Sequence, residues 1–181
     1  NNSLLADKIG NLASRVLKFA NKRFDNKIPA VDGVLEDEFL TASRENFAQI
    51  GGLIENHELR KAAQALIAGC SALNQFFDKL EPWKKIKSDD PATQMLCAQA
   101  VERCIAHLDL LSRRLSPFCP RSSAKLSEML GDASSGSVSS WGIDDVTEVL
   151  AAGTELGTAE VLFAKIDSDA IVAEIGKLGG K

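Results

Sequence analysis

The side chains best suited to binding a ligand begin on one stripe near the start of the chain. Asn11, Arg15, Lys18 and Lys22 are spaced by four, three and four residues, so a helix places them on one face. An asparagine amide both donates and accepts hydrogen bonds, and an arginine presents a rigid fork of donors, so the first two could read the edge of a nucleobase. The plainer interpretation is a solvated helix face, with lysines near the negative end of the helix dipole. On spacing alone, the plainer interpretation is favoured.

A second binding feature is Trp83, one of two tryptophans in the chain. It follows Pro82, which interrupts a predicted helix, and precedes Lys84 and Lys85. An indole beside lysines can act as a platform for single-stranded nucleic acid, because a base stacks on the ring and the cations meet the phosphates. The alternative is a tryptophan folded back onto the protein as a lid. Residue types alone leave both interpretations open.

Motifs that would carry catalysis or bind a metal are not found in the sequence. It contains no Gly-rich phosphate loop, Gly-x-Ser-x-Gly elbow or His-Glu-x-x-His pair. His57 and His107 lie at no metal-ligand spacing from the four cysteines. Cys97 and Cys104, seven residues apart, fit small core residues on one helix face. We therefore expect no catalytic, cofactor or metal site within this chain, and a reducing, cytoplasmic setting.

The net charge of −4 conceals an uneven distribution of charge along the chain. Residues 1–27 hold six Lys/Arg against two Asp, a net +4, and residues 28–127 sum to −1. Residues 128–181 hold three Lys against ten Asp/Glu, a net −7. A polyanion would therefore bind the basic end rather than the acidic end. No apolar run approaches the roughly 20 residues that cross a bilayer, so the sequence predicts a soluble protein without a membrane partner.

Apolar periodicity predicts an all-α protein. Helices are predicted over residues 3–24 and about 35–55, from a cap at Asn56 through Leu80, from Pro91 through Leu115, and over residues 121–130. We expect residues 1–131 to form a helical bundle. Residues 132–181 are predicted to contain a flexible Gly/Ser-rich loop, an extended segment over 141–166 that wraps back over the bundle, and a terminal helix that begins near Asp167.

Four stretches of the sequence resemble one known family, in that family's order and spacing. They are "NLASRVLKFANKRFD" (11–25), "LNQFFDKLEPWKKIK" (73–87), "LSPFCPRSS" (115–123) and "LFAKID" (162–167). Together they resemble the C-terminal part of methionyl-tRNA synthetase, and the resemblance spans nearly the whole chain. It implies an α-helical anticodon-binding bundle of the class I aminoacyl-tRNA synthetases, which recognises the CAU anticodon of methionine tRNA.

The resemblance also implies roles for particular residues. It implies that Trp83 stacks on the first base of the anticodon, a cytosine, and that Pro82 sets the backbone of this tryptophan. Asn11 and Arg15 match the residues that recognise the same cytosine. Contacts to phosphates are expected from neighbouring lysines, namely Lys18, Lys22, Lys84 and Lys85.

The resemblance has further implications outside this site. Segment 141–166 would pass back toward a catalytic domain, with Trp141 as a packing anchor. Cys119 stands where the family usually has methionine, and Ala164 stands where it often has proline. The first departure affects packing, and the second weakens only the match of the closing segment.

The catalytic signatures of the family, a His-Ile-Gly-His-like motif and a Lys-Met-Ser-Lys-Ser-like loop, are missing from this sequence. The chain is therefore expected to be a noncatalytic part of an enzyme whose catalytic domain lies elsewhere. For that enzyme the resemblance implies ATP and Mg, and it admits a Zn ion in the catalytic half. The expected partners are methionine tRNA and the catalytic domain.

Two other functions remain open on the residues. One is a helical protein-interaction domain without RNA specificity, which the leucine-rich seams and the acidic C-terminal end would suit. The other is the corresponding domain of a class I synthetase with a different anticodon, although the Pro82–Trp83 pair disfavours it.

Overall fold

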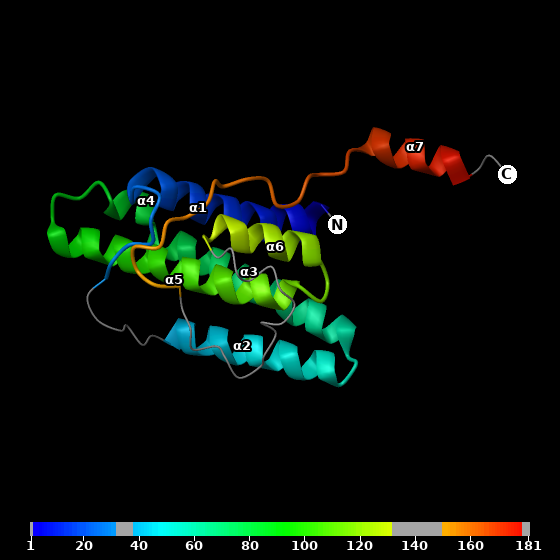
Figure 1. Cartoon of the computed structure of the whole chain (residues 1–181), viewed down its shortest axis with the longest axis horizontal. Coiled ribbons are helices and arrows are strands. Elements are labelled where there is room, and N and C mark those ends of the chain that lie inside the picture. The colour runs from blue at the N-terminus through cyan, green and yellow to red at the C-terminus, as the bar shows by residue number, and fades with distance from the viewer. Residues whose placement is uncertain (1, 32–37, 132–149, 179–181) are drawn as a thin grey trace.

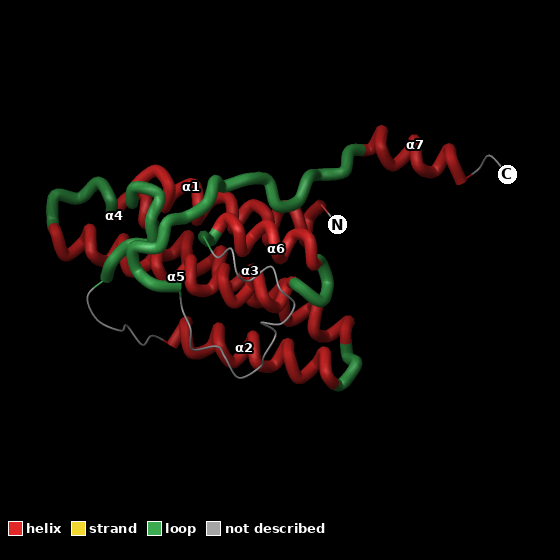
Figure 2. Tube along the Cα trace, in the orientation of Figure 1, coloured by secondary structure: helices red, strands yellow, loops and turns green. Residues whose placement is uncertain are grey.

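The computed structural model describes residues 2–31, 38–131 and 150–178. Its helices are η1 (Asn2–Gly10), α1 (Asn11–Arg23), α2 (Glu38–Glu55), α3 (Leu59–Leu80), α4 (Pro82–Lys85), α5 (Pro91–Leu115), α6 (Pro120–Met129) and α7 (Ser168–Leu178) (Figures 1 and 2). The predicted all-α class is confirmed for the described residues, which contain no strand beyond one isolated bridge. None of the helices in these ranges combines the length and hydropathy that a bilayer crossing needs.

The helix predicted over residues 3–24 is present as two consecutive elements. η1 is wound as a π-helix, and Gly10 joins it to α1 with helical dihedral angles (φ −63°, ψ −42°), so the chain does not break between them. The apolar stripe that predicts this helix is fully buried at its centre, at Ile9, Leu12 and Val16, whereas Leu5 and Phe19 at its two ends are half-buried. This burial orients the stripe of Asn11 and Arg15 away from the core.

Helix α5 is the central element of the bundle, because it packs against α1, α2, α3, α4 and α6. It begins as predicted, with Pro91 in the first turn and the Asp90 carboxylate accepting hydrogen bonds from the amides of Ala92 and Thr93. Cys97 and Cys104 are fully buried, which confirms that they are core residues.

The prediction that Asn56 caps the helix after it is wrong. Its side-chain amide donates instead to the carbonyl of Gly52 at 2.9 Å, so Asn56 closes the C-terminal end of α2. The next residue, His57, has a left-handed backbone (φ 61°) that turns the chain toward α3. The apolar period of the sequence also predicts Leu59 on the buried stripe of α3. Leu59 is instead 55% exposed, because α3 only starts at this residue and has not yet reached the core.

The segment 150–167, here called the strap, runs without regular structure along the bundle (Figure 1). Its beginning is tied to the end of α1: Leu156 and Asn26 exchange hydrogen bonds at 2.7 and 2.5 Å. Its end is tied to η1, because Asn2 bonds both backbone groups of Ile166. The extended segment is therefore confirmed from residue 150 onward, whereas residues 141–149, with Trp141, and the loop over 132–140 lie outside the described residues.

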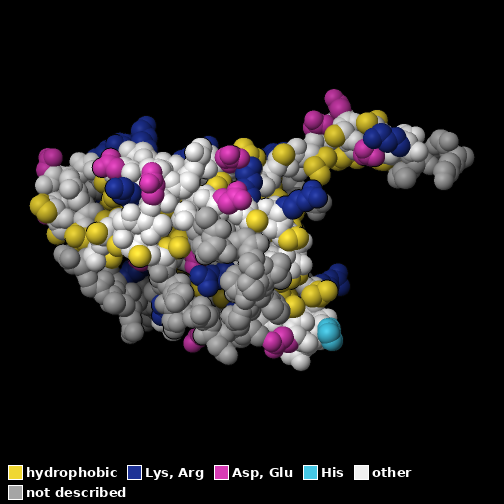
Figure 3. Space-filling model, viewed as in Figure 1, with side chains coloured by type: hydrophobic (Ala, Val, Ile, Leu, Met, Phe, Trp, Pro, Cys, Tyr) yellow, Lys and Arg dark blue, Asp and Glu magenta, His cyan; other side chains and the backbone are white. Residues whose placement is uncertain are grey.

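The predicted terminal helix is present as α7, which projects away from the bundle (Figure 1). Its apolar side chains are open to solvent: Ile171, Val172 and Ile175 are 49%, 67% and 61% exposed. Figure 3 shows hydrophobic and acidic side chains side by side on the surface of this helix. Helix α7 thus contributes little to the core of the described residues.

Candidate nucleic-acid interface

The short helix α4 presents Trp83 beside the end of α3. Glu81 adopts a left-handed conformation (φ 44°, ψ 54°), which ends α3 and reverses the chain into α4. Pro82 is buried in the first turn of α4, where its missing amide leaves no hydrogen bond unmade. The buried proline therefore offers little surface to a ligand.

The structure brings Trp83 and Arg15 together. The indole is half-buried against Phe77, with ring centroids 5.8 Å apart. The guanidinium carbon of Arg15 lies 5.3 Å from the Phe77 ring and 5.9 Å from the Trp83 ring, which are cation–π distances. The tryptophan is thus neither a free-standing platform nor a fully buried lid: one part packs on the bundle and another part stays accessible.

Asp78 is part of this cluster and was not anticipated from the sequence. Its carboxylate accepts a hydrogen bond from the Arg15 guanidinium at 2.5 Å, and both side chains are substantially exposed, at 56% and 36%. Asp78 is five residues before Trp83, so no helical spacing links the two, and 63 residues separate it from Arg15. Only the crossing of α1 and α3 brings it to the site.

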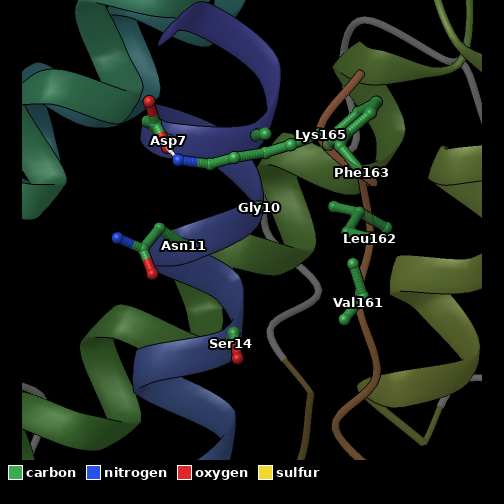
Figure 4. A pocket seen from close by; sticks show the side chains of 9 residues that line it. Asp7, Gly10, Asn11, Ser14, Val161, Leu162, Phe163 and Lys165 are labelled. Atoms are coloured by element: carbon green, nitrogen blue, oxygen red, sulfur yellow. Dashed lines mark ion pairs between the residues drawn. The ribbon is translucent and has the colours of Figure 1, made fainter. Parts of the chain in front are cut away.

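Asn11 lies one helical turn before Arg15 and lines a cavity of about 280 Å³ between the start of α1 and the strap. Figure 4 shows Asn11 and Ser14 on α1 and Val161, Leu162 and Phe163 on the strap beside it; in this view the Asn11 amide points away from the strap. Asn11 is exposed and shares the face of Arg15. Within the described residues, no hydrogen bond, ion pair or ring contact joins Asn11 to Trp83.

Lys165 and Asp7, which both line the cavity, form an ion pair at 2.6 Å (Figure 4). This pair joins the strap to η1, so the strap wall of the cavity is held by charge as well as by the Asn2–Ile166 hydrogen bonds.

Comparisons with known proteins agree with this architecture. A family model described as the anticodon binding domain of methionyl tRNA ligase matches residues 29–181. The chain belongs to this family. Asn11 and Arg15 precede the matched range, but similarity to curated relatives extends over them.

Two such relatives are named methionine–tRNA ligases. "Methionine--tRNA ligase 1" of Alkaliphilus oremlandii is 31% identical over 99% of this chain, and "Methionine--tRNA ligase" of Caulobacter vibrioides is 30% identical over 97% of it. The chain spans about a third of the length of these relatives, 31% in each case.

A solved structure shows the same fold. The apo form of Mycobacterium tuberculosis methionyl-tRNA synthetase superposes with a TM-score of 0.79 at 22% identity, over 92% of this chain and 33% of that one. At this identity the likeness concerns the fold. It supports the predicted anticodon-binding type of helical bundle.

The four candidate lysines of this anticodon-binding domain fall into two groups. Lys18 and Lys22 are exposed on α1, and no ion pair engages them within the described part of the chain. Lys84 pairs with Glu81 at 2.6 Å, and the Lys85 ammonium donates to the carbonyl of Leu80 at the end of α3. Lys84 and Lys85 therefore stabilise the turn into α4. Their positions in the sequence did not indicate this role.

The cysteines of the domain are placed for packing. Burial raises the pKa of Cys97 to about 11 and that of Cys70 to about 12, so both are thiols at neutral pH and poor nucleophiles or metal ligands. In the described ranges, no three His, Cys, Asp or Glu side chains come together as metal ligands would.

Proposed function

We propose that this domain recognises the CAU anticodon of methionine tRNA. Trp83 stacks on the cytosine at the first anticodon position, and Arg15 and Asn11 hydrogen-bond to its edge. Pro82 acts through the backbone. Lys18 and Lys22 contact phosphates. Lys84 and Lys85 do so to the extent that they leave their partners, the Glu81 carboxylate and the Leu80 carbonyl.

The observation that carries this proposal is the cluster of Arg15, Phe77 and Trp83. A partly accessible indole with a guanidinium about 6 Å from its centre combines a stacking surface with a donor fork, which suits a cytosine because its O2 and N3 accept hydrogen bonds. Asp78 holds the guanidinium at this position before any ligand is present. The basic stripe on α1 continues from the same cluster, so the backbone of an RNA loop has cations to follow.

We further propose that the domain serves a methionine–tRNA ligase whose catalytic domain lies outside this chain. That domain would use ATP and Mg, and a Zn ion would belong to the catalytic half. The strap and α7 would contact it, since α7 exposes the apolar side chains of Ile171, Val172 and Ile175. The setting expected for this enzyme is the cytoplasm.

Binding of an anticodon stem-loop tests the recognition proposal. We expect Trp83→Ala to weaken binding of a CAU stem-loop by about 1–3 kcal/mol in fluorescence anisotropy titrations, because a stacked base is lost. Arg15→Ala should weaken it through the loss of the donor fork. Lys61→Ala is the matched control, because it removes a cation from the far end of α3, where Lys61 pairs with Glu58.

A stem-loop with a changed anticodon separates this proposal from the alternatives. The protein could bind CAU and changed loops equally, with no effect of Trp83→Ala or Arg15→Ala. That result would contradict anticodon recognition and favour the protein-interaction domain. Preference for a different anticodon would indicate the domain of another class I synthetase.

A further inference from the structure

Helix α4 has only four residues, too few to be stable by itself, so its position must come from contacts with other elements. Phe77 of α3 packs against the side of the indole. Helix α4 also packs against α5. The orientation of Trp83 therefore depends on what joins α4 to α5.

Cys97 of α5 makes this junction. It is fully buried, and its thiol lies 3.4 Å from the carbonyl oxygen of Pro82, within hydrogen-bond distance for sulfur. The same carbonyl accepts the amide of Ile86 at 3.0 Å, which closes the single turn of α4. The Pro82 carbonyl thus accepts one hydrogen bond within the turn of α4 and one from α5, and Pro82 directly precedes Trp83.

The thiol is in the form that can donate. Burial raises the pKa of Cys97, so the S–H proton is retained at neutral pH even though Lys85 and Arg23 lie near enough to favour the thiolate. Cys104, two turns later on α5, is equally buried but lies in the centre of the bundle. The two cysteines thus have the same chemistry and different neighbours.

We propose that Cys97 is a positioning residue for base recognition: its hydrogen bond to the Pro82 carbonyl fixes α4 so that Trp83 faces the anticodon base. The proposal rests on the recognition function proposed above. It assigns Cys97 no contact with RNA, so its effect must pass through the indole.

The test uses two stem-loops, one with the CAU anticodon and one that is abasic at the first anticodon position. We expect Cys97→Ala and Cys97→Val, which remove the donor, to weaken binding of the CAU loop about two- to fivefold and to leave the abasic loop unchanged. Cys97→Ser retains a donor and should restore most of the affinity. Cys104→Ala removes an equal volume from the same helix and should affect both loops alike or not at all.

A second readout follows the indole without RNA. In a Trp141→Phe background Trp83 is the one remaining tryptophan, and we expect acrylamide to quench its emission more strongly in Cys97→Ala and Cys97→Val than in Cys97→Ser. The valine variant carries the test if the alanine variant does not fold. Unchanged affinity and quenching, or equal weakening of both loops, would overturn the proposal.

The two proposals fail in different ways. If the wild-type protein bound the CAU and abasic loops equally, base recognition would be wrong, and the quenching experiment would still decide whether Cys97 holds the indole. Suppose instead that the wild-type protein prefers the CAU loop and the Cys97 variants keep the same preference. In that case base recognition would stand and only the positioning role of Cys97 would be wrong.

Discussion

Arg15 is held by two kinds of interaction at the residue scale, an ion pair with Asp78 and the faces of two aromatic rings. The ion pair is exposed, so its contribution to folding should be small, whereas its effect on the direction of the guanidinium should be large. We expect Asp78→Asn to change the free energy of unfolding by less than about 1 kcal/mol and to reduce the difference in affinity between CAU and abasic loops. Urea unfolding and anisotropy titrations measure the two quantities.

Asp89→Asn is the control for this prediction. It removes a negative charge from the loop after α4, and Asp89 is not the partner of Arg15. If Asp78 acts only through its negative charge, Asp89→Asn should have the same effect on RNA binding. If Asp78 acts by orienting the Arg15 guanidinium, Asp89→Asn should not reproduce its effect.

His107 makes a second prediction at this scale. It is buried between Phe39 and Phe47, and its Nδ1 forms a hydrogen bond with the hydroxyl of Ser43. Burial lowers the pKa of His107 from 6.5 to about 3, so below pH 6.5 the unfolded chain binds a proton that the folded protein does not. The free energy of unfolding should therefore fall as the pH drops from 6.5 toward 3, by up to about 1.4 kcal/mol per pH unit from this group.

Urea unfolding at several pH values between 7 and 4 measures this slope. His107→Gln should flatten it, because the titrating group is gone. Ser43→Ala should lower stability but keep the slope, since the buried imidazole remains. Identical slopes in wild type and His107→Gln would contradict the assignment.

Residue types made Arg15 and Trp83 candidates, and the resemblance to a known family singled them out; the structure places their side chains together. Sequence reasoning missed Asp78 and the pairing of Lys85 with the Leu80 carbonyl because both depend on tertiary or turn geometry. An ion pair between residues 15 and 78 has no local signature, and a left-handed Glu81 has none either, since glutamate rarely adopts that conformation.

At the scale of elements, the strap depends on one glycine, Gly157, where it crosses α6. A Cβ atom on Gly157 would lie 2.4 Å from the carbonyl oxygen of Glu128, so the strap would have to move off the helix. We expect Gly157→Ala to reduce the free energy of unfolding by about 1–3 kcal/mol, measured by urea denaturation.

Gly52→Ala supplies the matched comparison, since nothing lies within 4 Å of its added Cβ and the residue is inside α2. It should increase stability by about 0.5–1 kcal/mol, because alanine is the better helix former. A loss of similar size in both variants would show that the contact with Glu128 is not responsible.

The helices other than α4 were predictable because each carries its own apolar period and, for α5, its own cap. The four residues of α4 are too few to show a period, and no helix was predicted there. Their ends were less predictable: Asn56 could cap either neighbouring helix by type, and only the geometry shows that it belongs to α2. The strap has no period because backbone groups of other elements specify its path. The π-helical winding of η1 was also not anticipated, since its apolar spacing fits an ordinary α-helix.

At the scale of the whole molecule, the N-terminal region carries a net positive charge and the C-terminal region a net negative charge. Because few basic side chains are concentrated at one end, RNA binding should depend on a small number of cations. Lys18 and Lys22 are the candidates without an ion pair in the described ranges. If each meets one phosphate of a single-stranded loop, the double variant Lys18→Ala/Lys22→Ala should reduce the slope of log affinity against log salt by about 1.4.

Lys84→Ala should change this slope less, because the Lys84 ammonium already faces the Glu81 carboxylate. Anisotropy titrations from about 50 to 200 mM salt measure both slopes. A slope that the double variant leaves unaltered would show that the α1 lysines do not meet phosphates.

The strap has a consequence for how this chain can change by mutation. Several of its anchoring bonds join main-chain atoms, as between Ile28 and Thr154 or between Gly157 and Met129. Main-chain bonds survive the replacement of most side chains, so sequence drift along the strap should be tolerated except at positions such as Gly157, where any side chain is too large. Over evolutionary time the path of the strap should outlast its sequence.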